Sequence, residues 1–322
     1  MSESQFINNN SNVHNLIKID GYWEPHSSSI DFCETNYLHT NLIVEVHNVW
    51  SSILGLSLFG IVGIIYGNPT KETRTFIYYF ILFIIGIGSA CLHGTLHWYY
   101  QSSDELPMLW LVLCGVYAVI EVDSPAGQPK YPNLALYLIG VSCLNTAIYY
   151  RFQHLFIVFF INFNMIVYAM VYKHLQIAWR IYKRVKEEER LKEEEATTKG
   201  SNNNWRTRND KIALRFYVWH AIVYTLIASP LWVLDQFHCE YLLPIYNNKL
   251  PGVLQGCTLH VLWHVFAGLG AYYFGQFLCT VRATTLGISC DTRRVLLGVL
   301  PVVVVVDDDK SIAASSGNEK KD

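Results

Sequence analysis

Seven long apolar segments dominate this 322-residue chain and restrict what it can fold into. Hydrophobic residues make up 52% of the sequence and charged residues only 16%, well below the share usual in soluble domains. A run of about 20 apolar residues is long enough to cross a bilayer as a helix. The sequence therefore predicts an all-α membrane protein, a seven-transmembrane helix bundle. The expected spans are 46–66, 75–98, 106–122, 132–149, 155–178, 212–234 and 253–280.

The distribution of Lys and Arg predicts how the bundle is oriented. The loops expected on one side, with the C-terminal tail and adjacent helix ends, hold 21 of the 24 Lys and Arg residues. The other side holds only Lys18, Arg151 and Lys249. Because cytosolic loops collect positive charge, we expect a lumenal N-terminus and a cytosolic C-terminus. The net charge of −2 gives no indication of a nucleic-acid partner, and no protein partner can be inferred.

The chain divides into three parts on this basis. Residues 1–45 form a lumenal segment without the apolar core of a signal peptide, 46–281 the seven-helix membrane domain, and 282–322 a cytosolic tail. A charged linker, 183–210, interrupts the membrane domain; its first part extends the fifth helix and the rest is a flexible connector. The apolar segment 295–306 is too short for an eighth span, and we expect it to touch the membrane or to remain disordered.

Two histidines, His260 and His264, interrupt the last apolar segment. They are four residues apart and therefore share one face of a helix. Ionisable side chains within a membrane are rare and functional by default, and this spacing supplies half of a zinc site. The alternative is that each ring only hydrogen-bonds to a neighbouring helix. Catalytic zinc usually takes three protein ligands and an open position, so a third ligand must come from elsewhere.

The end of the second span offers two candidates for that ligand, His93 and His97, with Ser89 on the same helix face. His97 lies nearer the helix end, in an interfacial Trp98-Tyr99-Tyr100 belt. We therefore prefer His93 as the ligand and interpret His97 as an interfacial, hydrogen-bonded histidine.

Acidic residues near the ends of other spans have two interpretations each. Asp104 either faces the zinc-bound water as a general base or, with Glu105, caps the third helix. Asp235, at the end of the sixth span, and the following His238 and Glu240 either support the metal ligands or are ordinary loop residues.

The segment before the first span collects hard oxygen donors. Asp31, Glu34 and Asn36 lie close together, and Glu45 follows at the helix start. Hard oxygen ligands suit calcium, although the spacing is not that of an EF-hand. A solvated acidic segment with a helix cap explains the same residues.

Four blocks of this sequence resemble the alkaline ceramidase family, membrane amide hydrolases of a seven-helix zinc superfamily. They are GYWEPHSSSIDFCETNY (21–37), GSACLHGTLHWYYQSSDELPM (88–108), WVLDQFHCE (232–240) and LHVLWH (259–264). The Asp-Glu-Leu-Pro-Met block, which begins eleven residues after His93, is the specific part. The blocks cover the whole predicted membrane domain.

The resemblance implies a set of site residues. Zinc would be held by His93, His260 and His264, with Ser89 beside the zinc or the oxyanion and Asp104 as general acid/base. It also implies a calcium site. The calcium ligands would be Asp31, the backbone carbonyl of Phe32, Glu34, Asn36 and Glu45. The family usually has Trp at the position of Phe32, a change that a backbone ligand tolerates.

The function implied by the resemblance is hydrolysis of ceramide to a sphingoid base and a fatty acid by a zinc-activated water. Ceramide and the lipid bilayer would be the partners, and the endoplasmic reticulum or Golgi membrane the location. Two alternatives stay open: a seven-helix receptor or sensor with a structural metal, and a related zinc hydrolase acting on another lipid amide or ester.

The predicted topology also selects a cysteine pair. Of the eight cysteines, four fall within spans and two at or beyond the cytosolic end of the last helix. Only Cys33 and Cys239 lie in lumenal segments, where disulfides persist. We expect these two to be joined; the alternative is that both remain free or are oxidised separately.

Overall fold

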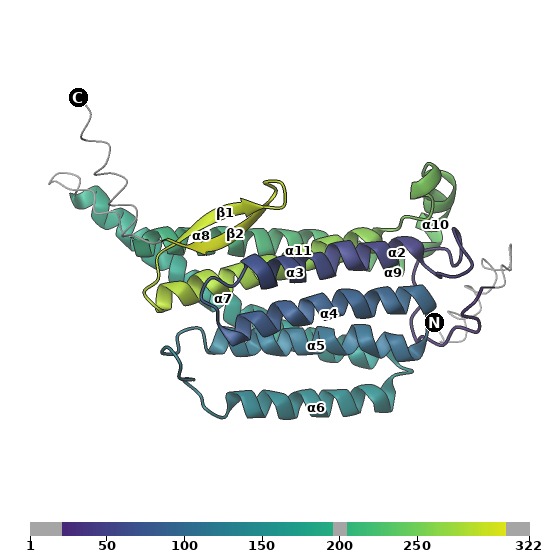
Figure 1. Ribbon diagram of the computed structural model, residues 1–322, viewed down its shortest axis with the longest axis horizontal. Helices are drawn as coiled ribbons and strands as arrows, with labels where there is room; N and C mark the ends of the chain where they lie inside the picture. Colours follow the sequence, from purple (N-terminus) through teal and green to yellow (C-terminus); the bar gives the residue numbers. More distant parts are fainter. Residues whose placement is uncertain (1–20, 196–204, 307–322) are drawn as a thin grey trace.

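A computed structural model describes residues 21–195 and 205–306 as one elongated bundle of helices that run lengthwise side by side (Figure 1). The first 20 residues, the later part of the linker (196–204) and the end of the tail (307–322) lie outside the described residues, as does any prediction that falls on them.

Most of the predicted spans correspond to one helix or one stack of consecutive helices. The first stack is α2 (Val46–Ser52), a π-helical turn η2 (Ile53–Ser57) and α3 (Leu58–Tyr66); α4 (Thr73–Thr95), α5 (Trp98–Ile120), α6 (Leu134–Phe152) and α7 (Phe156–Glu195) follow. The remaining helices are α8 (Trp205–His220), the π-helical η3 (Ala221–Ala228), α9 (Ser229–Phe237), α10 (Cys239–Asn248), a short turn η4 (Gly252–Leu254) and α11 (Leu259–Thr285). As predicted, the fifth helix continues into the charged linker.

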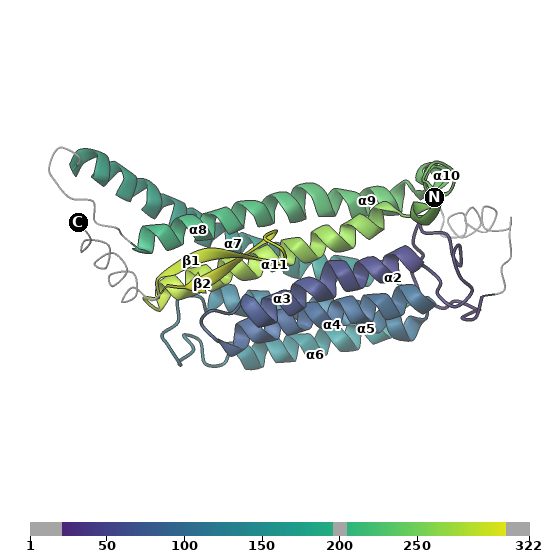
Figure 2. The ribbon, with the colours of Figure 1, turned by 45° about the horizontal axis from the view of Figure 1, so that its top comes forward.

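Five helical stretches in the described part of the chain are long and apolar enough to cross a membrane. They are Val46–Tyr66, Thr73–Thr95, Trp98–Ile120, Phe156–Glu194 and Trp205–Phe237. The helices α6 and α11 run alongside these five in both views (Figures 1 and 2) but are less apolar over their length. In α11 the reason is visible in the sequence, because this helix carries His260, His264, Gln276 and Arg282, all buried inside the bundle. The structure thus supports a multi-pass membrane bundle with five clear spans among the described residues, and the expected number of seven stays a prediction.

The third helix begins earlier than predicted. We expected a start at 106, but α5 begins at Trp98 and contains Pro107. Polar residues fill its first turns because they are buried by the segment before α2; the Gln101 side chain, for example, accepts a hydrogen bond from the backbone N–H of Ser29 at 2.8 Å. Asp104 and Glu105 therefore lie inside the helix, and the interpretation of these two residues as an N-terminal cap is wrong.

The C-terminal apolar segment folds into a β-hairpin, which corrects the all-α expectation. Strand β1 (Cys290–Val295) pairs antiparallel with β2 (Leu300–Val305), with Cys290 opposite Val305. The hairpin packs beside α11 and α3 (Figure 2), where Val302 and Val303 are fully buried. The backbone N–H of Val303 donates to Gln276 Oε1 at 2.8 Å. The expectation that 295–306 stays disordered is wrong because α11 provides both an apolar surface and a buried hydrogen-bond partner.

Two close helix crossings set the relative positions of helices inside the bundle. A Cβ on Gly88 of α4 would lie 1.9 Å from the carbonyl oxygen of Ser103 in α5, and one on Gly268 of α11 would lie 1.9 Å from that of Gly55 in η2. Glycine at both positions lets the helix backbones touch, as small residues do in membrane bundles. The crossing at Gly88 sets Ser89 on α4 beside Asp104 on α5.

The predicted disulfide is confirmed. Cys33, in the segment before α2, is bonded to Cys239 at the start of α10, with their Cα atoms 5.5 Å apart. The bond closes 206 residues of sequence and fastens the segment before α2 to the end of the bundle where α10 lies. A second contact, from Asn247 Nδ2 to Thr35 Oγ1 at 2.8 Å, holds the same two segments together.

Candidate metal centre

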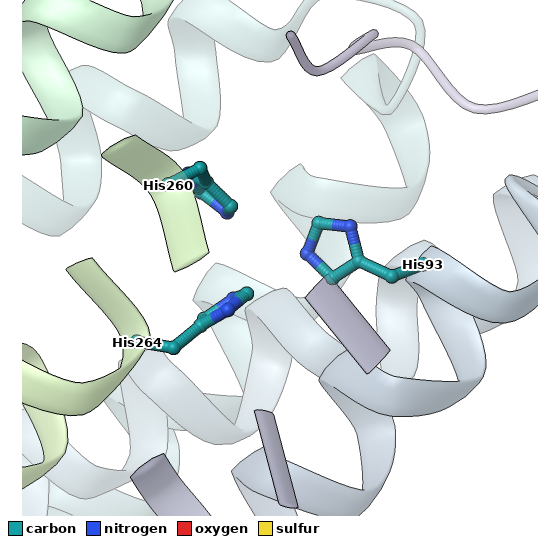
Figure 3. Close-up of side chains that lie close together, drawn as sticks. All are labelled: His93, His260 and His264. Carbon is teal, nitrogen blue, oxygen red and sulfur yellow. The ribbon is translucent and has the colours of Figure 1, made fainter. Parts of the chain in front are cut away.

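Three buried histidines from two helices meet near one end of the bundle. His93 comes from the last turn of α4, and His260 and His264 come from the first two turns of α11. Figure 3 shows the three rings pointing toward one another, and one ring nitrogen of each lies within 4.8 Å of those of the other two. His97 is not in this group; it lies between α4 and α5, with Nδ1 3.4 Å from Ser27 Oγ. The structure therefore brings His93, rather than His97, to the histidine pair of α11.

Two of the rings have a buried nitrogen without a hydrogen-bond partner. These atoms are Nε2 of His93 and Nδ1 of His260. A buried polar atom that lacks a partner costs free energy, of the order of 1–3 kcal/mol. A metal ion held by the three imidazoles would remove that cost, and buried neutral imidazoles are a donor set that suits zinc. The group could therefore hold a metal ion.

Hydrogen bonds behind the rings fix their orientation. Glu45 Oε2 lies 2.5 Å from Nδ1 of His93, which leaves Nε2 of that ring facing the other histidines. Ser51 Oγ lies 2.7 Å from Nδ1 of His264. Partners of this kind orient metal ligands and make them more basic. The Asp235 carboxylate, which is fully buried, accepts a hydrogen bond from the backbone N–H of His260 at 3.2 Å.

Sequence reasoning missed two of these contacts. The sequence does not predict a role for Ser51, and it predicts Glu45 as a calcium ligand or as part of a solvated, helix-capping segment, not as a partner of His93. The signal was available, because Asn48, Ser51 and Ser52 are polar residues within an otherwise apolar span, and such residues are rare in a membrane unless they have a partner. Of the three residues at the end of the sixth span, only Asp235 reaches the centre, because His238 and Glu240 are exposed.

Ser89 and Asp104 lie next to the histidines. Ser89 Oγ is 3.3 Å from Nε2 of His264 and also hydrogen-bonds the carboxylate of Asp104. The hydroxyl of Ser52 donates to Ser89 Oγ at 3.0 Å and holds it in place. A single hydroxyl thus links a candidate metal ligand to a buried carboxylate. This arrangement can position a water molecule or a carbonyl oxygen between them.

Asp104 also lines a narrow apolar cavity of about 80 Å³ that extends into the bundle. On α11 the lining runs from Trp263 to Phe274, a rise of about 16 Å along the helix axis. Most of the other lining residues are apolar, among them Leu82, Val112 and Val167. The cavity can accommodate part of an alkyl chain whose polar end lies at Asp104.

The residues of the expected calcium site lie close to this centre without forming a closed cluster. Glu34 is fully buried and caps α2, since its two carboxylate oxygens accept the backbone N–H groups of His47 and Asn48, each at 2.8 Å. Asp31 is exposed, and its Oδ1 accepts the N–H of Phe32. The helix-cap interpretation therefore holds for Glu34.

Two oxygen atoms of the same set have no hydrogen-bond partner. They are Oδ1 of Asn36 and Oε1 of Glu45, and both are buried. Burial raises the pKa of Glu45, and the neighbouring carboxylates of Glu34 and Asp31 raise it further. A nearby cation would lower that pKa and satisfy both oxygen atoms.

The Phe32 side chain covers the histidine group. Its ring centroid lies 4.5 Å from that of His93 and 4.6 Å from that of His260. The residue therefore contributes an apolar wall to the metal centre, in addition to any contact made by its backbone.

Comparison with known proteins identifies the family to which this chain belongs. Residues 24–303 match the family described as Ceramidase. The chain belongs to the ceramidase family. It is 27% identical over 286 residues to alkaline ceramidase 3 of Mus musculus, a match that covers 88% of this chain and 94% of the relative. It is also 27% identical to an alkaline ceramidase of Arabidopsis thaliana, with coverage of 89% and 96%, and to alkaline ceramidase YPC1 of Saccharomyces cerevisiae, with coverage of 85% and 82%. The expected family is confirmed.

The histidine geometry predicts where the metal of this ceramidase-family protein is held. Replacing His264 by Ala removes one of three convergent imidazoles, and we expect the purified protein to lose most of its bound metal by elemental analysis. The matched control is His97→Ala, which removes an imidazole from the same end of the bundle but outside the group, and it should keep the metal. Full metal content in His264→Ala, or loss in the control alone, would contradict this assignment.

Proposed function

We propose that this protein hydrolyses the amide bond of ceramide to a sphingoid base and a free fatty acid. The observation that carries the proposal is the position of Asp104, which lines an apolar cavity and is linked by Ser89 to a buried group of three histidines. Membership of the ceramidase family and similarity to proteins named alkaline ceramidases support the choice of substrate. A site inside a multi-pass membrane protein also suits a substrate whose alkyl chains remain in lipid.

Zinc is the metal that fits the donor set best. His93, His260 and His264 would hold it with neutral imidazole nitrogens and leave a fourth position open, the pattern of catalytic rather than structural sites. When bound, zinc would lower the pKa of a water molecule and polarise the amide carbonyl. The presence of Ser89 and Asp104 beside the three histidines favours a hydrolase over a receptor or sensor with a structural metal.

Asp104 is the residue we assign to proton transfer. Its carboxylate would accept a proton from the attacking water and deliver it to the nitrogen of the leaving sphingoid base, so that the water oxygen remains on the fatty acid. Ser89 holds this carboxylate by a hydrogen bond. Once Asp104 has taken the proton it no longer needs that donor, and the Ser89 hydroxyl would donate instead to the oxygen on which negative charge develops. Glu45 and Ser51 would keep the rings of His93 and His264 in orientation.

Calcium is proposed for the segment before α2, with Asp31, the carbonyl of Phe32, Glu34, Asn36 and Glu45 as ligands. The support is the pair of unsatisfied buried oxygens on Asn36 and Glu45, beside the carboxylate of Glu34. Because Glu45 also bonds His93, a cation here would act on the orientation of a zinc ligand.

We further propose seven spans, a lumenal N-terminus and a cytosolic C-terminus, in the endoplasmic reticulum or Golgi membrane. The helices α6 and α11 lie parallel to the five clear spans, and together they give an odd number of crossings (Figures 1 and 2). The Cys33–Cys239 disulfide supports this orientation because disulfides persist in the lumen and not in the cytosol.

The role of Asp104 can be tested with the variant Asp104→Asn. An amide cannot accept the proton, so turnover should fall by about 10²–10⁴-fold while bound metal is retained. Fatty acid released from a panel of ceramides is measured by mass spectrometry. The control is Asp123→Asn, a surface position that pairs with Arg180 outside the cavity. Normal turnover in a folded, metal-loaded Asp104→Asn protein would exclude the proposed role, and release from other lipid amides or esters alone would exclude the substrate.

The calcium assignment predicts a defined loss of binding. Replacing Asn36 by Ala removes a buried, unpaired oxygen, and calcium affinity measured by titration calorimetry should fall at least about tenfold. Asn41→Ala, an exposed change in the same segment, should leave affinity as it is. A wild-type protein that takes up no calcium would refute the site.

The topology can be tested at both ends of the chain. Asn9-Asn10-Ser11, which lies outside the described residues, is an N-glycosylation sequon and should be modified because it faces the lumen. A reporter fused to the C-terminus should be accessible from the cytosol only. A lumenal C-terminal reporter would overturn the orientation and favour a receptor-like protein.

A further inference from the structure

A second, larger cavity lies at the opposite end of the bundle from the histidines. It has a volume of about 670 Å³ and is bounded by α4, α5, α6 and the loop that joins α5 to α6. Arg74 on its rim and His93 are 19 residues apart on α4, about 28 Å along the helix. No residue lines both this cavity and the one at Asp104. It is therefore a separate site, which the proposed hydrolysis does not use.

The walls of this cavity are apolar over most of their depth. They include Ile77 of α4, Trp110, Leu113 and Tyr117 of α5, and Leu138 and Ile139 of α6. Helix α6 lies at the edge of the bundle next to α5 (Figure 1), and its outer side chains Leu136 and Tyr137 are exposed. Covering apolar walls of this kind removes them from water, which is favourable. In a bilayer, the apolar group available to enter between α5 and α6 is a lipid chain.

The rim of the cavity is polar and carries positive charge. Lys71, Arg74, Ser124 and Gln128 line it. The Glu72 carboxylate is shared by two arginines, Arg74 and Arg282, at 2.8 Å each. Lys71 makes no salt bridge to any described residue.

A second carboxylate near the rim is that of Glu121. Its two oxygens accept the backbone N–H groups of Lys130 and Tyr131, at 2.7 and 2.8 Å. With Glu121 counted, the three cations named above still outnumber the two carboxylates, and a ligand with a negative head and an apolar tail complements both parts of the cavity.

We propose that this cavity binds an anionic membrane phospholipid. The phosphate would lie at Lys71, within reach of the side-chain amide of Gln128, and one acyl chain would lie between α5 and α6. Basic pockets between membrane helices select lipid headgroups in this way. A phospholipid is favoured over a free fatty acid because the two side-chain donors of the rim, Lys71 and Gln128, lie on different loops, and a phosphate with its headgroup spans them better than a single carboxylate.

The headgroup part of the proposal is tested on the full-length protein in detergent by native mass spectrometry. Dioleoyl phosphatidylserine, dioleoyl phosphatidylcholine and oleate are titrated separately. The phosphatidylserine should bind about five-fold more tightly than the phosphatidylcholine, which is the contribution of one lysine near an anionic lipid surface. Lys71→Gln should abolish this preference. The control Lys249→Gln, at the end of α10 on the other side of the bundle, should keep it.

The acyl-chain part is tested by filling the cavity. Ser142 lines it, whereas the next residue, Cys143, does not and is exposed. Ser142→Phe should therefore weaken the binding of both phospholipids, and Cys143→Phe should leave the binding of both unchanged. Unchanged thermal unfolding and metal content show that each variant is folded. Equal binding of the two phospholipids by the wild type would overturn the proposal. So would phospholipid binding that survives Ser142→Phe, or a cavity that takes up oleate but no phospholipid.

Discussion

Three imidazole rings buried in the interior of a membrane bundle are the constraint on which the rest of this structure depends. Each ring must be neutral and correctly oriented to bind a metal, and each buried polar atom needs a partner, because burial without one costs free energy. The hydrogen bond between Glu45 and His93 meets this need for one ligand, and the one between Ser51 and His264 meets it for another. The tight crossing at Gly268 brings the first helical stack close to α11, and the crossing at Gly88 brings Asp104 of α5 beside Ser89 of α4.

The two ends of the bundle satisfy their buried polar groups in different ways. At the histidine end, the partners come from a non-helical segment that the Cys33–Cys239 disulfide fastens in place. At the other end, they come from a β-hairpin, whose Val303 N–H meets the fully buried side chain of Gln276. Gln276 in turn donates to the hydroxyl of Tyr79 at 2.6 Å. The hairpin is therefore part of the bundle core, although it follows the last helix.

The sequence could predict the features that depend on local spacing or on the side of the membrane. The i, i+4 pair on α11, the choice of His93 by its depth and the pairing of two lumenal cysteines belong to this class. Features that depend on a distant partner could not be predicted. The sequence places Asp104 and Glu105 at the start of a helix, yet both lie within α5, whose first turns are bound to the segment before α2 through Gln101 and Ser29. Likewise, 300–305 becomes a strand because Tyr272 and Gln276, about one helical turn apart, hydrogen-bond to its backbone at Pro301 and Val303.

Glu45 connects the two metal sites that we propose. One of its oxygens bonds His93 and the other is buried and unpaired, so the carboxylate stands between the histidine group and the acidic segment. Its backbone N–H also donates to the carbonyl of His93 at 3.0 Å, which fixes the distance between the two chain segments. A charged Glu45 suits a neutral His93 that donates from Nδ1, and a cation beside Oε1 would favour that charged form. Calcium binding in the segment before α2 and the orientation of a zinc ligand in α4 would therefore both depend on whether the carboxylate of Glu45 is charged.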